Sequence, residues 1–120
     1  MDAPKIFESE YRFCLILWDN EPINSTRLVE LCKENLGWSK ATTYTVIRRL
    51  SERGVVKNEN ATVSALISKE EAQKHRLEAM VEETFEGSMP AFIAAFSKSK
   101  RLTRNEVEQL QALIDNFREE

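Results

Sequence analysis

Residues 37–56 constrain the fold of this chain more than any other segment. Gly37 is suited to end one helix, and Ser39 is suited to cap the start of the next. Within residues 40–53 the apolar positions recur at helical spacing, a second glycine follows, and a short β-branched run begins at Val55. This order predicts the second helix of a helix-turn-helix followed by the first strand of a wing.

The patterns on either side of this segment complete a mainly α fold. A capping box that begins at Ser68 opens a helix that runs to residue 85, and a loop at 58–61 separates two β-branched runs. The predicted helices and strands are residues 8–18, 26–36, 40–53, 55–57, 62–67, 69–85, 90–96 and 104–117. We therefore predict a winged helix-turn-helix of three helices plus a β-hairpin wing over residues 1–68. A helical dimerisation region is predicted over residues 69–120.

The C-terminal helices have strong apolar stripes and no globular body of their own. A single helix pair cannot bury such stripes in a monomer. We therefore predict that a second copy of the chain covers them in a dimer with twofold symmetry. The residues predicted to form its interface are Leu77, Val81, Phe85, Phe92, Phe96, Leu110, Leu113, Ile114 and Phe117. A second interpretation is a pocket for a small-molecule inducer at the dimer interface, lined by Phe85, Met89, Phe92, Phe96 and Phe117. We favour the dimer core.

The predicted recognition helix presents polar side chains on the face opposite its apolar stripe. Hydroxyls can bond phosphates or base edges, cations can bind phosphate or guanine, and methyl groups can contact thymine. The first turn also lies at the positive end of the helix dipole. The predicted DNA-binding residues are Ser39, Lys40, Ala41, Thr42, Tyr44, Thr45 and Arg48. They predict binding to double-stranded DNA in the major groove.

The charge balance weakens this prediction and keeps a second one open. The net charge is −3, whereas DNA affinity depends on neutralising phosphates. Nine basic and eight acidic residues lie in residues 1–58, and eight basic and twelve acidic residues lie in 59–120. The acid is therefore concentrated in the C-terminal half. The alternative is a winged-helix module that binds another protein and never contacts DNA.

Little in the sequence favours catalysis, a cofactor or a metal. His75 is the only histidine, and Cys14 and Cys32 are isolated thiols without CxxC spacing. Each thiol is expected to pack as a small core residue. No phosphate-binding loop or nucleophile motif occurs. We expect no enzyme, no cofactor and no metal site.

Apolar runs in the chain are too short to span a membrane, and residues 1–5 do not resemble a signal peptide. Two unpaired thiols suit a reducing compartment. We therefore expect a cytoplasmic protein without stable membrane association.

The chain resembles the BlaI/MecI/CopY family of winged-helix repressors, the penicillinase-repressor type, over essentially its whole length. Matching positions in the N-terminal half are Glu8, Glu10, Trp18, Trp38, Ser39, Thr42, Thr45, Arg49, Leu50 and Gly54. In the C-terminal half the stretches 85–88 and 92–96 and the final amphipathic helix match. The resemblance implies a homodimer that binds a palindromic operator and represses resistance or homeostasis genes.

Three departures from the family pattern bear on function. The wing, residues 61–66, has no arginine and no aromatic residue, which weakens any wing contact with DNA. The cysteine cluster of the copper-responsive branch is missing. In the β-lactam branch an Asn-Phe bond in the short dimerisation helix is cleaved, and the matching bond here is Ala95-Phe96. Relief of repression by a membrane sensor-protease is therefore a hypothesis.

Overall fold

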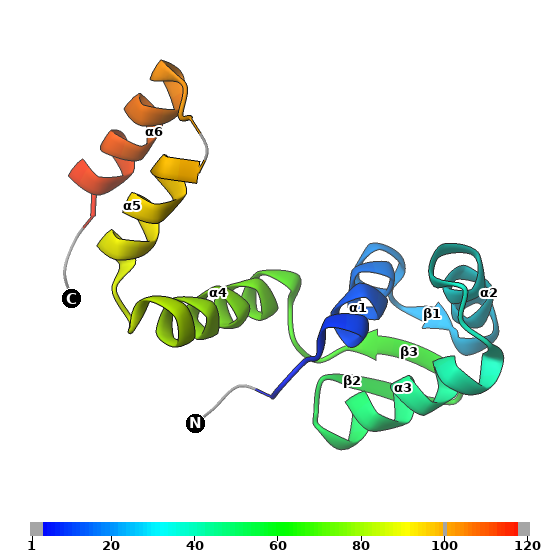
Figure 1. Ribbon diagram of the computed structural model, residues 1–120. Helices are drawn as coiled ribbons and strands as arrows, with labels where there is room; N and C mark the ends of the chain where they lie inside the picture. Colours follow the sequence, from blue (N-terminus) through cyan, green and yellow to red (C-terminus); the bar gives the residue numbers. More distant parts are fainter. Residues whose placement is uncertain (1–3, 100, 118–120) are drawn as a thin grey trace. The chain divides into compact units, whose positions relative to one another are not determined.

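The computed structural model describes residues 4–99 and 101–117 and divides the chain into two compact units (Figure 1). The first extends to Leu77 and the second begins at Glu78. The boundary expected after residue 68 lies inside the first unit. The difference arises because the first turns of a long helix, α4 (Lys69–Phe85), pack with the N-terminal unit.

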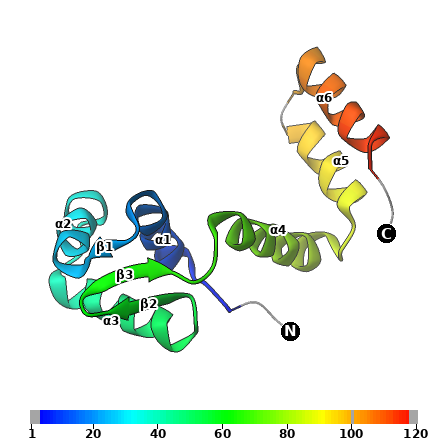
Figure 2. The same ribbon diagram turned by 180° about the vertical axis from the view of Figure 1, so that it is seen from behind.

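The first unit consists of three helices and a small antiparallel sheet, seen from two sides in Figures 1 and 2. The helices are α1 (Glu8–Asn20), α2 (Ser25–Leu36) and α3 (Lys40–Glu52). The sheet order is β1 (Ile23–Asn24), β3 (Thr62–Ala65) and β2 (Val56–Glu59). This arrangement, followed by a helical C-terminal region, confirms the predicted fold class.

Strand β1 is absent from the sequence prediction. It is two residues long, with Ile23 opposite Val63 and Asn24 opposite Thr62. Two residues cannot show the alternation by which a strand is recognised in a sequence. The strand exists because β3 supplies a partner about forty positions further along the chain.

The core of the first unit lies between the helices and the sheet. Phe13, Leu17, Leu28, Leu50 and Val63 each have an exposed fraction of 0%. They come from α1, α2, α3 and β3, so every main element contributes to one cluster. Burial of this kind contributes about 1.5–3 kcal/mol per large apolar side chain.

The wing turn is tighter than the sequence predicts. A four-residue loop is expected at 58–61, but Asn58 and Glu59 pair with β3 and leave only Asn60 and Ala61 as the turn. Both turn residues have positive φ, 52° and 63°. A two-residue turn with two positive φ values follows the right-handed twist of the flanking strands, which explains the close hairpin.

The second unit contains the rest of α4 together with α5 (Met89–Ser99) and α6 (Arg104–Asp115). The capping box predicted at Thr103 is confirmed, because its side chain accepts from the Glu106 N–H and the Glu106 carboxylate accepts in return. Helix α5 runs further than the predicted end at residue 96. Ser97 bonds back to the Ile93 carbonyl, so this polar residue continues the helix instead of ending it.

Candidate nucleic-acid interface

Helix α3 begins at the predicted residue, Lys40, and ends at Glu52, one residue before the predicted end. The Ser39 hydroxyl accepts the Thr42 N–H at 3.1 Å, and Gly37 has a φ of 70° at the end of α2. Thr43, Val46, Ile47 and Leu50 are buried, as the apolar stripe predicts. The opposite face of the helix is consequently left toward solvent.

Most of the predicted DNA-binding residues lie on this outer face. Ser39, Lys40, Ala41, Thr42 and Arg48 are exposed, and Thr45 is half-buried. Together with the N-terminal end of the helix dipole they form a polar surface with two cations. We call Ser39, Lys40, Ala41, Thr42, Thr45 and Arg48 the α3 outer face.

Tyr44 differs from these residues because it is half-buried and packs against the core cluster. Its hydroxyl lies 3.1 Å from the Ser25 Oγ at the first turn of α2. This bond fastens α3 to α2, a structural role that periodicity alone does not reveal. Contact of Tyr44 with DNA stays a prediction.

Arg48 already has an acidic neighbour in the free protein. Its guanidinium lies 3.3 Å from the Glu52 carboxylate one turn further along α3, and both side chains are more than half exposed. Exposed pairs of this type contribute only about 0–1 kcal/mol. Arg48 can therefore exchange this partner for a phosphate or a guanine at small cost.

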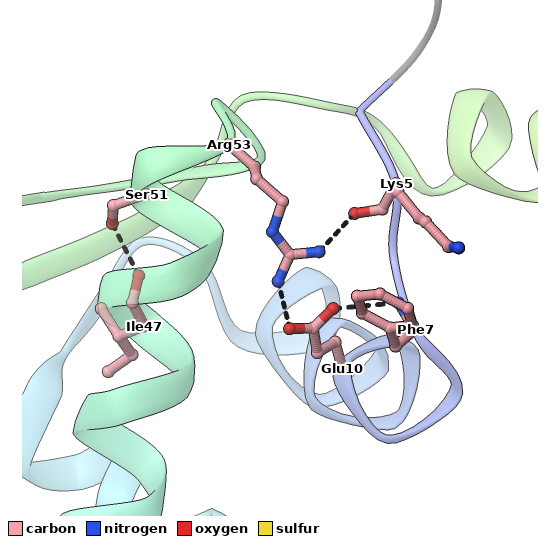
Figure 3. Close-up of polar contacts among 6 residues, drawn as sticks. All are labelled: Lys5, Phe7, Glu10, Ile47, Ser51 and Arg53. Atoms are coloured by element: carbon pink, nitrogen blue, oxygen red, sulfur yellow. Dashed lines mark hydrogen bonds and ion pairs between the residues drawn. The ribbon is translucent and has the colours of Figure 1, made fainter.

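A partly buried ion pair positions the end of α3 (Figure 3). Arg53, the residue after the helix, donates to the Glu10 carboxylate on α1 and to the Lys5 carbonyl at 2.7 Å. Glu10 also accepts the Phe7 N–H at 2.9 Å, and its side chain is only 7% exposed. We call Lys5, Phe7, Glu10 and Arg53 the Arg53 cluster.

The electrostatics of this cluster favour an ionised Glu10. Burial by itself would raise the pKa of its carboxyl, but hydrogen bonds from Arg53 and Phe7 and the charges of Arg53 and Arg49 outweigh burial, so the pKa is lowered. The sequence indicated Glu10 through the family resemblance alone. No local signal pairs it with Arg53, which lies 43 positions away.

The wing supplies little positive charge. Lys57 is the only cation in residues 55–67, and its ammonium lies 3.9 Å from the Glu59 carboxylate. The wing turn is tied to α2, because the Ser25 N–H donates to the Ala61 carbonyl at 2.7 Å. The wing thus forms a short, fastened hairpin beside the start of α2.

The predicted dimerisation residues divide into three groups: exposed, half-buried and buried. Leu77 and Phe96 are 41% and 39% exposed, and Leu113, Ile114 and Phe117 are 67–77% exposed. Phe85, Phe92 and Leu110 are half-buried, and the Phe85 and Phe92 rings meet edge to face at 5.7 Å. Val81 is only 5% exposed within the single chain, so little of it is left for a partner to cover.

An apolar hollow lies between α5 and α6. Its lining residues are Met89, Pro90, Ile93, Ala94, Leu110, Leu113 and Ile114. Ala95 and Phe96, at the bond matching the family's cleavage position, are exposed residues inside α5.

Both thiols are buried, as predicted. Burial raises the pKa of Cys14 to about 12 and that of Cys32 to about 11, so neither is a reactive thiolate. Among the described residues no group of three or more potential ligands is placed to hold a metal ion. Nor does any described helix combine the length and apolarity needed to cross a bilayer.

Comparison with known proteins connects this geometry to a family. A family model described as "Penicillinase repressor" matches residues 6–116. The methicillin resistance regulatory protein MecI of Staphylococcus aureus (strain Mu50) is 20% identical over 115 residues, which cover 92% of this chain and 94% of MecI. An uncharacterized 16.5 kDa protein in the ptsI 3'region of Latilactobacillus sakei is 25% identical over 114 residues, covering 92% of this chain and 78% of that protein. These matches confirm the predicted family resemblance.

Proposed function

The chain belongs to the penicillinase repressor family, a family of transcriptional repressors, and we propose that it is a homodimer that binds a palindromic DNA operator. The observation that carries this proposal is the α3 outer face. It presents hydroxyls, methyl groups and two cations on a helix whose opposite face is buried in the core. A rigid helix with this chemistry suits the major groove.

Roles within the α3 outer face follow from position. Lys40 and the hydroxyls of Ser39 and Thr42 lie in the first turn, from which a recognition helix contacts base edges and nearby phosphates. Arg48 lies two turns further on and would bind a phosphate or a guanine after leaving Glu52. The Arg53 cluster holds α3 in place and does not itself contact DNA in this proposal.

Dimerisation is supported by the apolar side chains that the single chain leaves uncovered. Leu113, Ile114 and Phe117 follow one another along the C-terminal end of the chain and are each at least two-thirds exposed. Soluble proteins seldom expose several such side chains in one patch unless a partner covers them. A second copy is the simplest partner and gives the twofold symmetry that a palindromic operator requires.

The deciding experiment selects random duplexes on the purified protein and titrates the best binder with salt. Enrichment of a palindrome, with affinity that falls steeply as salt rises, is the expected result. The matched pair of variants is Lys40→Glu on the α3 outer face and Lys74→Glu on α4, since each makes the same charge change. Only Lys40→Glu should abolish enrichment. If no sequence is enriched and nothing binds at low salt, operator binding is wrong.

Release from DNA by an inducing signal completes the proposal, with cleavage by a membrane sensor-protease as one route. The candidate bond joins Ala95 and Phe96, which are exposed. Because the bond lies within helix α5, cleavage requires this helix to open locally. Cells exposed to a β-lactam should then contain a fragment ending at residue 95. An intact chain together with induced target genes would exclude this route.

The protein-binding module remains the alternative function. The observation that favours it is the wing, where Lys57 lies beside Glu59 and no arginine is available. A DNA-binding protein shows counterion-driven affinity for random duplex at low salt, whereas this module would not. The salt titration therefore separates the two functions.

A further inference from the structure

The first turns of α4 are fastened to α1 by contacts that DNA recognition does not require. The Arg76 guanidinium on α4 lies 2.8 Å from the Glu8 carboxylate. The same guanidinium lies over the Tyr11 ring, 3.8 Å from its centroid. One arginine thus contacts two residues one turn apart on α1 through an ion pair and a cation–π contact.

Neighbouring contacts extend this attachment. The Gln73 amide donates to the Tyr11 hydroxyl at 3.3 Å, and the Tyr11 ring meets Trp18 edge to face at 5.8 Å. The Trp18 indole N–H donates to the Ile67 carbonyl at 2.9 Å, which fixes the chain just before α4 begins. Ala72, on the first turn of α4, is only 3% exposed. The start of α4 is therefore attached to the first unit both by the residue before the helix, Ile67, and by residues in its first turns.

The charges at this contact favour the attached state. The hydrogen bond from Arg76 and its positive charge hold the pKa of Glu8 below its ordinary value, against a small opposing effect of burial. Glu8 is thus ionised near neutral pH and remains a partner for Arg76. The contact is exposed enough that its loss should leave the core of the first unit intact.

We propose that Glu8, Tyr11 and Arg76 form a joint that fixes the start of α4 on the DNA-binding unit and so limits the half-site spacings that the homodimer accepts. The inference rests on the proposed function, since it requires a dimer on a palindrome. Residues 66–88, most of which form α4, are the only stretch of chain between the last strand of the winged helix and α5. A free hinge before α4 would let each winged helix reach half-sites at several spacings, whereas a fixed start admits few.

The test measures affinity for three duplexes with the full-length protein. They are the selected palindrome, the same palindrome with one base pair inserted at its centre, and an isolated half-site. One inserted base pair turns the half-sites by roughly 35° relative to each other. The spacing ratio is the affinity for the palindrome divided by the affinity for the insertion duplex. The variants are Arg76→Gln and Glu8→Gln, with Lys74→Gln as the control on an exposed cation of α4.

We expect the wild type to have a high spacing ratio and Arg76→Gln to lower it about three- to tenfold. Glu8→Gln should lower it less, because the contact of Arg76 with Tyr11 remains. Half-site affinity should be unchanged in all variants, and Lys74→Gln should match the wild type. A role in folding alone would lower half-site affinity together with the ratio, so the two roles are distinguishable.

Four results overturn the inference in different ways. If Arg76→Gln keeps the wild-type spacing ratio, or the wild type has no spacing preference, the joint is wrong while operator binding stands. If half-site affinity falls in parallel with the ratio, Arg76 acts on stability and not on spacing. If the wild type binds no duplex, the proposed function fails and the joint fails with it. Circular dichroism of each variant establishes that it is folded.

Discussion

At the scale of single residues, helix α3 gives neighbouring threonines opposite roles. Thr43 has an exposed fraction of 0%, and its hydroxyl donates to the Ser39 carbonyl at 3.1 Å. Thr42 is exposed and Thr45 is half-buried. A rotation of about 100° per residue therefore separates a core side chain from two that are candidates for DNA contact. Substitution of Thr43 should therefore change the stability of the protein, whereas substitution of Thr42 or Thr45 should change its affinity for DNA.

Removing a cation from the α3 outer face should weaken operator binding without unfolding the protein. For Arg48→Ala or Lys40→Ala we expect a loss of about 1–3 kcal/mol if the side chain contacts a base. If it contacts a phosphate, the slope of affinity against salt should fall by about one. Titrations at matched salt check this, with Lys33→Ala on α2 as the control. Unchanged affinity and slope would remove the residue from the interface.

Because of the Arg53 cluster, the free energy of unfolding should fall at acidic pH. Since the pKa of Glu10 is lower in the folded state, its contribution is fully present above the unfolded pKa, near 4.5. It is lost as the pH falls through the lowered, folded value. Glu10→Ala leaves Arg53 without its carboxylate and should lower the free energy of unfolding by about 1–3 kcal/mol at pH 7. The measurement is urea unfolding at pH 7 and pH 3.

The loss caused by Glu10→Ala should shrink between pH 7 and pH 3, because below the unfolded pKa the unfolded wild type binds a proton at Glu10 more readily than the folded wild type does. Glu70→Ala, at an exposed position on α4, is the control and should have little effect at either pH. An equal loss for Glu10→Ala at both pH values would mean that packing, and not the ion pair, stabilises this cluster.

At the scale of elements, the wing turn contains a residue with an unfavourable backbone conformation. Ala61 has a φ of 63°, which costs a residue with a Cβ about 1–2 kcal/mol. Glycine avoids this strain but loses more backbone entropy on folding. Ala61→Gly should therefore raise the free energy of unfolding by about 0.5–1 kcal/mol. Thermal unfolding checks this, and Ala65→Gly within β3 should have the opposite effect.

Helix α6 is the element on which dimerisation is expected to depend. Leu113→Glu places a charge on an apolar position that the single chain leaves 69% exposed. In a monomer this change should cost little, but in a dimer it would bury an unpaired charge. Light scattering should then report monomers and operator affinity should fall. Gln109→Glu, an exposed polar position on the same helix, is the charge-matched control.

One experimental result would contradict the dimer prediction directly. A wild type that is monomeric at high concentration would make it wrong. A molecule other than a second copy of this chain would then have to cover the exposed apolar side chains of α5 and α6.

Local elements were largely predictable from the sequence. The caps at Ser39 and Thr103 and the end of α2 at Gly37 are confirmed because each depends on hydrogen bonds within five residues. The ends of α5 and of the wing loop were not predicted correctly. Ser97 and Glu59 have polar side chains that are typical of loops, yet their backbones continue a helix and a strand.

At the scale of the whole molecule, the sequence determined the helices, their buried faces and the family. Those properties depend on residues a few positions apart, so periodicity and capping residues specify them. Tertiary structure alone decided the pairing of β1 with β3, the Arg53 cluster and the contact of Arg76 with Glu8. The last two join residues 43 and 68 positions apart. Such partners are chosen by how the elements pack, because nothing in the local sequence of a charged side chain specifies which distant charge will lie beside it.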